Sequence, residues 1–189
     1  MSRIANFIDG AYLDHTLRDE FNAARLDYQL LAEWMATGID LLRTYYYNCL
    51  PYQSSPPTIE ESQRFSQAQG FHRRLQRLSR FEVRDGKLEF RGMDANGKPI
   101  FVQKRVDIQI GVDLVLLAAK HQVTHAALLS GDSDLLPAVQ VAKAEGVLIH
   151  LYHGTASPPH TDLWEAADER TRISQDIVNR ILRPARLAT

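Results

Sequence analysis

The chain alternates short apolar runs with longer segments whose apolar residues recur every three or four positions. The short runs predict buried strands, and the longer segments predict helices. This alternation is typical of α/β proteins with a mainly parallel sheet, because a parallel strand pair needs a long crossover connection. The expected strands cover residues 3–9, 40–49, 124–130 and 147–152, and the expected helices cover 26–37, 59–80, 106–121 and 134–145.

The remaining segments fit a single domain over residues 1–189. Asp-Gly and Asn-Gly pairs at 85–86 and 96–97 are hairpin turn signals, so residues 81–104 predict a third strand that continues into a β excursion. Residues 106–121 are apolar nearly all round, which predicts a buried helix. Residues 163–182 predict one or two helices, with a C-terminal helix at about 170–183.

Composition limits the function classes. A chain of 189 residues with 44% hydrophobic and 24% charged residues suits one globular domain. A net charge of −1 argues against retention on nucleic acid by bulk positive charge, but it is compatible with a nuclease whose site is acidic. The single cysteine, Cys49, excludes an internal disulfide and a cysteine-rich zinc site. The sequence has neither a signal-peptide pattern nor an apolar run of about 20 residues, so we expect a cytoplasmic protein.

Five aspartates follow or flank the expected strands: Asp9, Asp107, Asp113, Asp132 and Asp134. In an open parallel sheet, ligands bind outside the carboxyl ends of the strands, where side chains from several strands meet. Clustered carboxylates raise one another's pKa unless a cation holds them, and oxygen-only ligands favour Mg²⁺ or Mn²⁺. We expect Asp9 and Asp132 to bind such an ion directly, with Asp113, Asp107 and Asp134 binding through water or completing the cluster.

Each aspartate also has a structural interpretation. Asp9 and Asp107 could cap the free N–H groups at the start of a helix, and so could one of Asp132 and Asp134 while the other points into the crevice. Asp107 and Asp113 are six positions apart and lie on different sides of a regular helix, so at least one of them could be structural. A lone ionised carboxylate among the apolar neighbours of Asp113 is costly unless it is paired, and the nearest cations in sequence are Lys104 and Arg105.

Three segments share a family pattern: Phe7-Ile8-Asp9-Gly10, Lys104-Arg105-Val106-Asp107 with Asp113, and Leu128-Leu129-Ser130-Gly131-Asp132-Ser133-Asp134-Leu135-Leu136-Pro137. Together they resemble the NYN domain family of the PIN-like nuclease superfamily, over about residues 3–173. The resemblance implies a three-layer α/β/α sandwich, Mg²⁺ or Mn²⁺ held by aspartates, and cleavage of single-stranded RNA. The family often carries Asn where this chain has Tyr12.

These observations favour an Mg²⁺- or Mn²⁺-dependent endoribonuclease. Ser130 and Ser133 are expected to hydrogen-bond to the carboxylates or to a phosphate, and Lys104, Arg73 and Arg77 are candidate contacts to the RNA backbone. A solvated helix face is the simpler interpretation of the arginines. The alternative function is a catalytically weak or inactive PIN-like module that regulates by binding RNA or a protein partner. A homo-oligomer is compatible with both functions.

A haloacid dehalogenase-like phosphatase would also use a parallel sheet, Mg²⁺ and aspartates at strand ends. That chemistry needs a second Asp two positions after the first-strand Asp9, where this chain has Ala11. Glycine-rich phosphate-binding loops are also absent from the sequence. The pattern therefore favours a nuclease over these other phosphate-handling enzymes.

Overall fold

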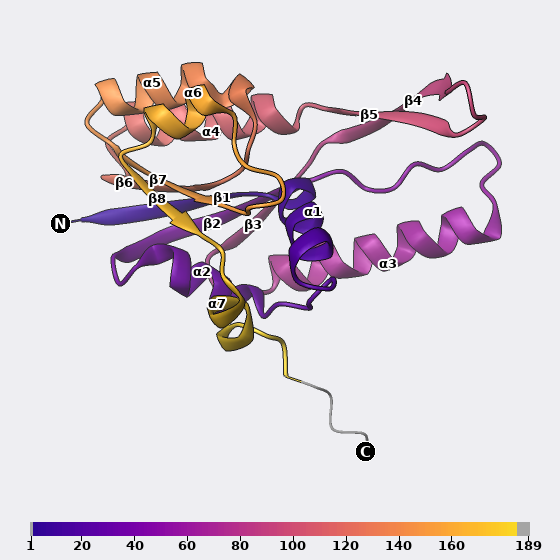
Figure 1. The fold of residues 1–189 in the computed structure, drawn as a ribbon, viewed down its shortest axis with the longest axis horizontal. Coiled ribbons are helices and arrows are strands. Elements are labelled where there is room, and N and C mark those ends of the chain that lie inside the picture. Colours follow the sequence, from indigo (N-terminus) through magenta and orange to yellow (C-terminus); the bar gives the residue numbers. More distant parts are fainter. Residues whose placement is uncertain (1, 185–189) are drawn as a thin grey trace.

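A computed structural model describes residues 2–184 and confirms the α/β class with a parallel central sheet (Figure 1). Its six strands lie in the order β3-β2-β1-β6-β7-β8, and every neighbouring pair is parallel. The strands are β1 (Arg3–Asp9), β2 (Asp40–Asn48), β3 (Phe81–Asp85), β6 (His125–Leu129), β7 (Leu148–His153) and β8 (Glu169–Arg172). Residues 1 and 185–189 of the expected single domain lie outside the described part of the chain.

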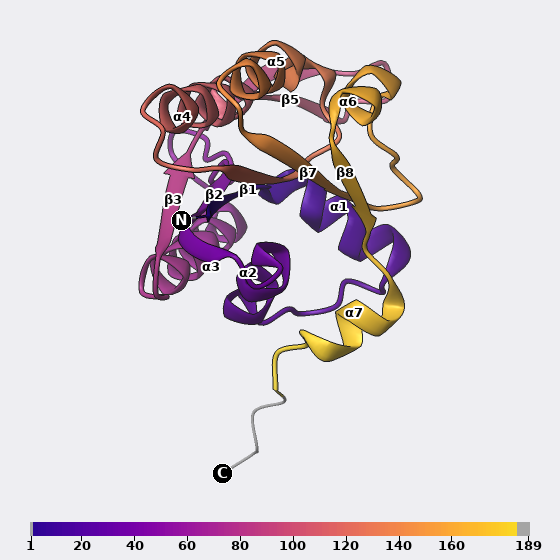
Figure 2. The same cartoon turned by 90° about the vertical axis from the view of Figure 1, so that its left-hand side faces the viewer.

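Helices cover both faces of the sheet and complete a three-layer sandwich (Figure 2). One face carries α4 (Val106–Ala119), the short 3-10 helix η1 (Ser133–Leu135), α5 (Leu136–Ala144) and α6 (Thr161–Ala166). The other face carries α1 (Gly10–Glu20), α2 (Tyr28–Ala36), α3 (Ile59–Gln76) and α7 (Gln175–Arg180). None of the helices in residues 2–184 combines the length and apolar character needed to cross a membrane.

The two faces of the sheet define two hydrophobic cores, and β1 contributes to both. Ala5 and Phe7 pack toward α4 and α5, whereas Ile4 and Ile8 pack toward α1 and α2. A parallel strand that is covered on both faces needs apolar residues at successive positions, because successive side chains point to opposite faces. This two-sided burial explains the continuous apolar runs that predicted the strands.

The sequence analysis gave no bounds for α1, although it considered Asp9 as the cap of a helix that starts there. Leu13 and Leu17 of the helix and its C-cap Phe21 recur every four positions and are buried in the core beneath the sheet. The other side chains of the helix are mostly polar and exposed, so the overall apolar content of the segment is low. The spacing and the capping Asp9 together were the available signal.

The helix expected at about 170–183 is partly wrong. Residues Glu169–Arg172 form β8, and the helix that follows, α7, covers Gln175–Arg180. β8 is the last strand of the sheet and pairs only with β7, so three of its four side chains are exposed. An edge strand of this kind needs no apolar alternation, which is the pattern that identifies strands in a sequence.

A separate antiparallel hairpin, β4 (Lys87–Met93) and β5 (Pro99–Lys104), extends from the carboxyl end of β3 (Figure 1). Asn96-Gly97 lies at its turn, as expected. Asp85-Gly86 does not form a hairpin turn, because it joins β3 of the central sheet to β4 of the hairpin.

The expectation that residues 106–121 form a fully buried helix is also wrong. One face of α4 packs on the sheet through Val106, Ile110 and Leu114. The opposite face leaves Ile108 71% exposed and Val112 58% exposed. The sheet can bury only one face of a helix in an outer layer, and apolar composition alone does not identify which face that is.

Two glycines with different surroundings test the packing around α1. A Cβ at Gly10 would overlap the buried Tyr46 hydroxyl and the Asn48 amide, whereas a Cβ at Gly70, inside α3, meets only the end of the Arg74 side chain at 3.5 Å. Urea denaturation should show that Gly10→Ala lowers the free energy of unfolding by about 1–3 kcal/mol. Gly70→Ala should raise it by about 0.5–1 kcal/mol, because alanine is the better helix former. Equal stability of the two variants would contradict this packing.

Candidate active site at the strand ends

The strand order reverses between β1 and β6, which lie side by side at the centre of the sheet. The chain leaves β1 into α1 on one face and leaves β6 into η1 and α5 on the other face (Figure 2). A crevice forms at such a switch point outside the carboxyl ends of the strands. Asp9 ends β1, and Asp132 follows β6, so the structure brings both residues to this edge.

Asp9 holds the start of α1 and faces Ser130. One carboxylate oxygen, Oδ1, accepts hydrogen bonds from the backbone N–H groups of Ala11 and Tyr12, both at 3.1 Å. The other oxygen, Oδ2, accepts a bond from the Ser130 hydroxyl at 3.4 Å. The Asp9 side chain is therefore fixed by its capping role, while Oδ2 remains on the side of the β6 loop.

Burial raises the pKa of Asp9 from 3.8 to about 6, and the negative charge of Asp107 contributes to the same shift. The hydrogen bonds from Tyr12, Ala11 and Ser130 oppose the shift without cancelling it. The ionised form of Asp9 is thus poorly compensated in the protein alone. A nearby cation would favour the ionised form.

The β6–α5 loop presents two further carboxylates. Asp132 accepts a hydrogen bond from the backbone N–H of Asp134 at 2.9 Å and so caps η1. The Ser130 hydroxyl accepts a bond from the Asp132 N–H at 3.3 Å, which links this loop to Asp9. Asp107 lies in the first turn of α4, and its pKa is raised by burial and by the charges of Asp132 and Asp134. Four of the five expected aspartates therefore share one electrostatic environment.

Asp113 has different partners. Its Oδ2 accepts hydrogen bonds from the Tyr47 hydroxyl at 2.9 Å and from Arg84 Nε at 3.2 Å. The pairing that the sequence suggested, with Lys104 or Arg105, is replaced by a contact with β2 and β3. The carboxylate is thus held against the sheet by α4, and we leave Asp113 out of the group at the strand ends.

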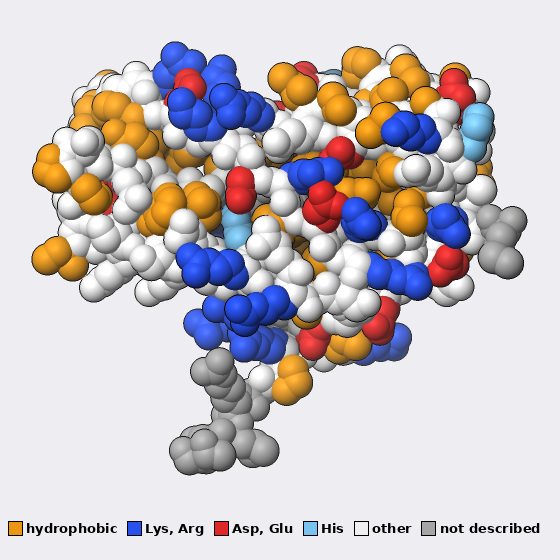
Figure 3. Space-filling model, turned by 180° about the vertical axis from the view of Figure 1, so that it is seen from behind, with side chains coloured by type: hydrophobic (Ala, Val, Ile, Leu, Met, Phe, Trp, Pro, Cys, Tyr) orange, Lys and Arg blue, Asp and Glu red, His pale blue; other side chains and the backbone are white. Residues whose placement is uncertain are grey.

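The expected nucleic-acid contacts are spread over the surface. Ser133 begins η1 and is half-buried, and Lys104 ends β5 and is exposed. Arg73 and Arg77 are exposed near the end of α3, in the layer opposite α4, and Arg73 donates a hydrogen bond to Gln69 at 3.1 Å. Figure 3 shows Lys and Arg side chains gathered near the end of α3, and a second group beside the β4–β5 hairpin. The structure therefore does not place the arginines together with Lys104.

The aspartates fit a hard divalent cation by donor type, because carboxylate oxygens are the ligands that Mg²⁺ and Mn²⁺ prefer. Their positions form no ready-made site: within residues 2–184, no three His, Cys, Asp or Glu side chains are grouped closely enough to hold a metal ion. Binding would require the side chains of Asp107, Asp132 or Asp134 to move toward Asp9. No other described residue donates a hydrogen bond to the side-chain carboxylate of Asp107 or Asp134, so no such bond opposes this movement.

Tyr12 closes one side of the crevice, a role that the sequence did not indicate. Its hydroxyl donates a hydrogen bond to the Ser157 carbonyl at 2.7 Å and accepts one from the Gly154 N–H at 3.2 Å. Its ring lies so close to Gly131 that a Cβ there would be 2.7 Å from Tyr12 Cε2. Tyr12 thus joins α1 to the loop after β7. The two segments are more than a hundred residues apart, and local sequence patterns do not predict contacts over that separation.

A parallel α/β sandwich with carboxylates at its switch point defines a class of proteins whose sites lie at the strand ends. The model of the NYN domain matches residues 3–174, nearly the whole chain. The chain therefore belongs to the NYN domain family, whose members are generally nucleases.

Two further proteins are similar to this chain. An uncharacterized protein of Sinorhizobium fredii (strain NBRC 101917 / NGR234), y4oD, is 45% identical over 49 residues, a match that covers 26% of this chain and 23% of the relative. A crystal structure of VPA0982 from Vibrio parahaemolyticus RIMD 2210633, a protein of unknown function, superposes with a TM-score of 0.60 at 18% identity and covers 96% of both chains. At that identity the match shows the shared fold alone.

The raised pKa of Asp9 predicts how stability depends on pH. Asp9→Asn removes the charge, and the amide oxygen can still cap α1. The stability that the raised pKa gives the wild type is fully present below pH 3.8 and is lost as the pH rises through about 6. In chelator, chemical denaturation should find Asp9→Asn more stable than the wild type at neutral pH, with a relative change on the order of 3 kcal/mol across this interval. A difference that does not change with pH would contradict the shift.

The contacts of Asp113 predict a structural effect. Asp113→Asn weakens the bonds from Tyr47 and Arg84, and the Arg84 side chain is 38% exposed, so solvent screens part of the ion pair. Urea denaturation should show a loss of about 1 kcal/mol in the free energy of unfolding. Stabilisation by added Mn²⁺ should be the same as in the wild type. Loss of that stabilisation would return Asp113 to the metal-binding group.

Proposed function

We propose that the protein is an Mg²⁺- or Mn²⁺-dependent ribonuclease that hydrolyses phosphodiester bonds in single-stranded RNA. The observation that carries the proposal is the position of the buried Asp9 at the switch point of the sheet, where the negative charge of Asp107 also acts on it. Asp132 and Asp134 act on Asp107 in the same way. Carboxylates that raise one another's pKa are an unfavourable arrangement unless a cation binds among them. The chain belongs to a family whose members are generally nucleases, which supports a role for these carboxylates in hydrolysis.

The same edge of the sheet also suits a phosphate. α4 begins beside the strand ends, and its N-terminus has no side-chain cap, unlike those of α1 and η1. Helix N-termini favour anions because their first N–H groups lack partners within the helix. The hydroxyls of Ser130 and Ser133 and the ammonium group of Lys104 remain the proposed contacts to the RNA backbone.

We assign each of these residues a separate role. Asp9 would bind the ion through Oδ2, since Oδ1 is occupied by the cap of α1. Asp132, Asp107 and Asp134 would complete the carboxylate group, directly or through water. A bound divalent ion supplies charge neutralisation at the phosphate and lowers the pKa of a bound water. Ser130 would hold the orientation of Asp9 through its hydroxyl.

A second function, RNA or protein binding without cleavage, is favoured by two observations. No ready-made metal site is grouped within residues 2–184. Tyr12 stands where the family often has Asn, and its hydroxyl is occupied by Ser157 and Gly154. A protein of this kind would act as a regulatory module on the same fold.

A cleavage assay separates the two functions. Purified protein with labelled single-stranded RNA and MnCl₂ should produce fragments, and chelator should prevent this. Asp9→Asn and Asp132→Asn should each lower the rate at least about 100-fold, because each removes a carboxylate from the reacting centre. Asp176→Asn, an exposed position in the first turn of α7, serves as the matched control and should cleave at the wild-type rate. Equal cleavage by all four proteins, or cleavage in chelator, would contradict the proposal.

Thermal unfolding tests the metal site without any RNA. MgCl₂ or MnCl₂ should raise the Tm of the wild type, because a ligand that binds only the folded state stabilises it. The Tm of Asp9→Asn and Asp132→Asn should not respond. RNA binding by a protein that neither cleaves nor responds to the ions would establish the regulatory alternative.

A further inference from the structure

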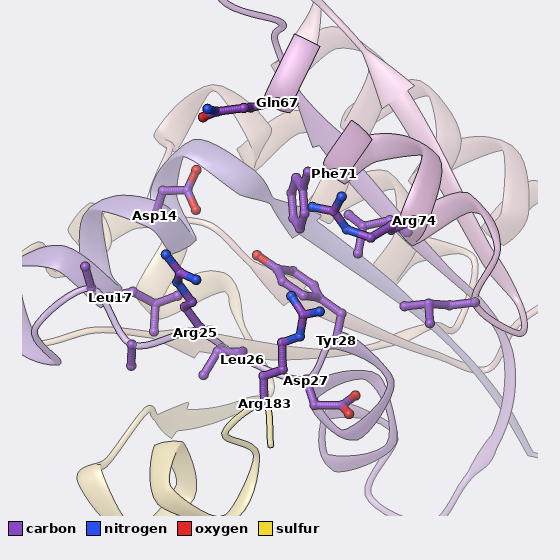
Figure 4. Close-up of a pocket in the computed structure, with 14 residues that line it drawn as sticks. Asp14, Leu17, Arg25, Leu26, Asp27, Tyr28, Gln67, Phe71, Arg74 and Arg183 are labelled. Carbon is purple, nitrogen blue, oxygen red and sulfur yellow. The ribbon is translucent and has the colours of Figure 1, made fainter. Parts of the chain in front are cut away.

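A pocket separate from the strand ends lies between α1, α2 and the second half of α3 (Figure 4). Its volume is about 670 Å³, and pockets for small molecules commonly measure about 300–1,000 Å³. It lies in the layer on the other side of the sheet from α4, where none of the four strand-end aspartates lines it. The proposed nuclease function makes no use of this pocket.

One wall of the pocket is aromatic and rigid. The Tyr28 ring packs edge-on against Phe71, with ring centroids 5.3 Å apart, and against Tyr46, with centroids 5.7 Å apart. Leu17 and Leu75 are buried beside them and complete an apolar lining. A flat aromatic ligand could stack here without ordering flexible side chains, because these rings are already fixed by one another.

Three arginines surround this apolar wall. Arg25, Arg74 and Arg183 line the pocket, and Figure 4 shows their side chains around Tyr28 and Phe71. No ion pair and no side-chain hydrogen bond is found for any of the three within residues 2–184, although other arginines such as Arg43 and Arg80 pair with nearby carboxylates. Guanidinium groups without partners beside an apolar surface are suited to binding a phosphate.

The two carboxylates in the lining do not neutralise this charge. Asp27 Oδ1 accepts the N–H groups of Gln29 and Leu30 at 2.9 Å and 3.2 Å, so it serves as the cap of α2. Asp14 lies on α1, and Figure 4 shows it on the same side of the pocket as Arg25, away from Arg74 and Arg183. Three arginines against two aspartates leave one excess positive charge. The pocket thus has an anion-binding side and one carboxylate that can accept hydrogen bonds from a ligand.

The backbone holds the two arginine-bearing segments together. The N–H of Arg183 donates to the carbonyl of Arg25 at 2.8 Å, and the N–H of Asp27 donates to the carbonyl of Ile181 at 2.8 Å. Leu26 and Leu182 form an isolated antiparallel bridge between these bonds. The backbones of Arg25 and Arg183 are therefore held side by side although the two residues are far apart in sequence.

We infer that this pocket binds a nucleoside phosphate, either a free mononucleotide or the 5′-phosphorylated end of an RNA. The base stacks on the wall formed by Tyr28 and Phe71. The phosphate lies among the arginines, and Asp14 accepts hydrogen bonds from the sugar hydroxyls or from an exocyclic amine. The site is distinct from the strand-end carboxylates and does not require a metal ion.

Isothermal titration calorimetry with AMP, in chelator, tests the inference. The wild type should show saturable binding at one site. Arg74→Ala and Arg25→Ala should each weaken binding at least about tenfold, the loss expected for one charge-assisted hydrogen bond. Arg64→Ala is the matched control, because Arg64 is an exposed arginine on the same helix α3 that does not line the pocket, so this variant should bind as the wild type does. Circular dichroism confirms that each variant is folded.

Further ligands and variants separate the possible outcomes. Adenosine and inorganic phosphate should each bind more weakly than AMP, since each makes only part of the contacts. A 5′-phosphorylated tetranucleotide that binds more tightly than AMP would identify an RNA end as the ligand, and the reverse order would identify a free nucleotide. The inference would be overturned if Arg74→Ala and Arg25→Ala bound AMP as tightly as the wild type does. It would also be overturned if Asp9→Asn abolished AMP binding, or if the wild type did not bind AMP at all. Asp9→Asn should bind AMP normally even if the nuclease proposal fails.

Discussion

The reversal of strand order between β1 and β6 is the constraint on which the functional site depends. It sends α1 to one face of the sheet and α5 to the other, which leaves a gap at the carboxyl ends of these two strands. Asp9 and the Ser130–Asp134 loop occupy that gap because each directly follows its strand. Residues that are more than a hundred positions apart thus interact through Ser130, whose hydroxyl contacts both Asp9 and the backbone of Asp132.

The two roles of Asp9 have opposite effects on the stability of the folded protein. As the cap of α1, it satisfies two N–H groups and stabilises the helix. As a buried carboxylate beside Asp107, it is costly to ionise, and its raised pKa reflects that cost. Residues that only build a fold seldom accept such a cost, whereas functional sites often do. The same reasoning gives Asp113 a different role, since the contacts with Tyr47 and Arg84 compensate its charge.

The sequence predicted the features that depend on local pattern. The strands β1, β2, β6 and β7 were identifiable because burial on two faces requires continuous apolar runs, and the positions of Asp9 and Asp132 follow from the ends of those runs. β8 could not be identified in this way, because an exposed edge strand has no such run. Arg84, one of the two partners of Asp113, lies 29 positions away in β3, and the pairing of Arg25 with Arg183 depends on the course of the whole chain. Contacts of this range depend on the tertiary structure, which a single sequence does not reveal by pattern.

The central claim is that the strand-end aspartates bind a divalent cation together. Anomalous diffraction from crystals soaked in MnCl₂ tests this claim most directly, because it locates the ion and its ligands in one experiment. The account predicts a manganese peak in contact with the carboxylates of Asp9 and Asp132, with Asp107 or Asp134 moved toward it. Fully occupied manganese elsewhere on the protein, or no peak between β1 and β6 at saturating MnCl₂, would contradict it.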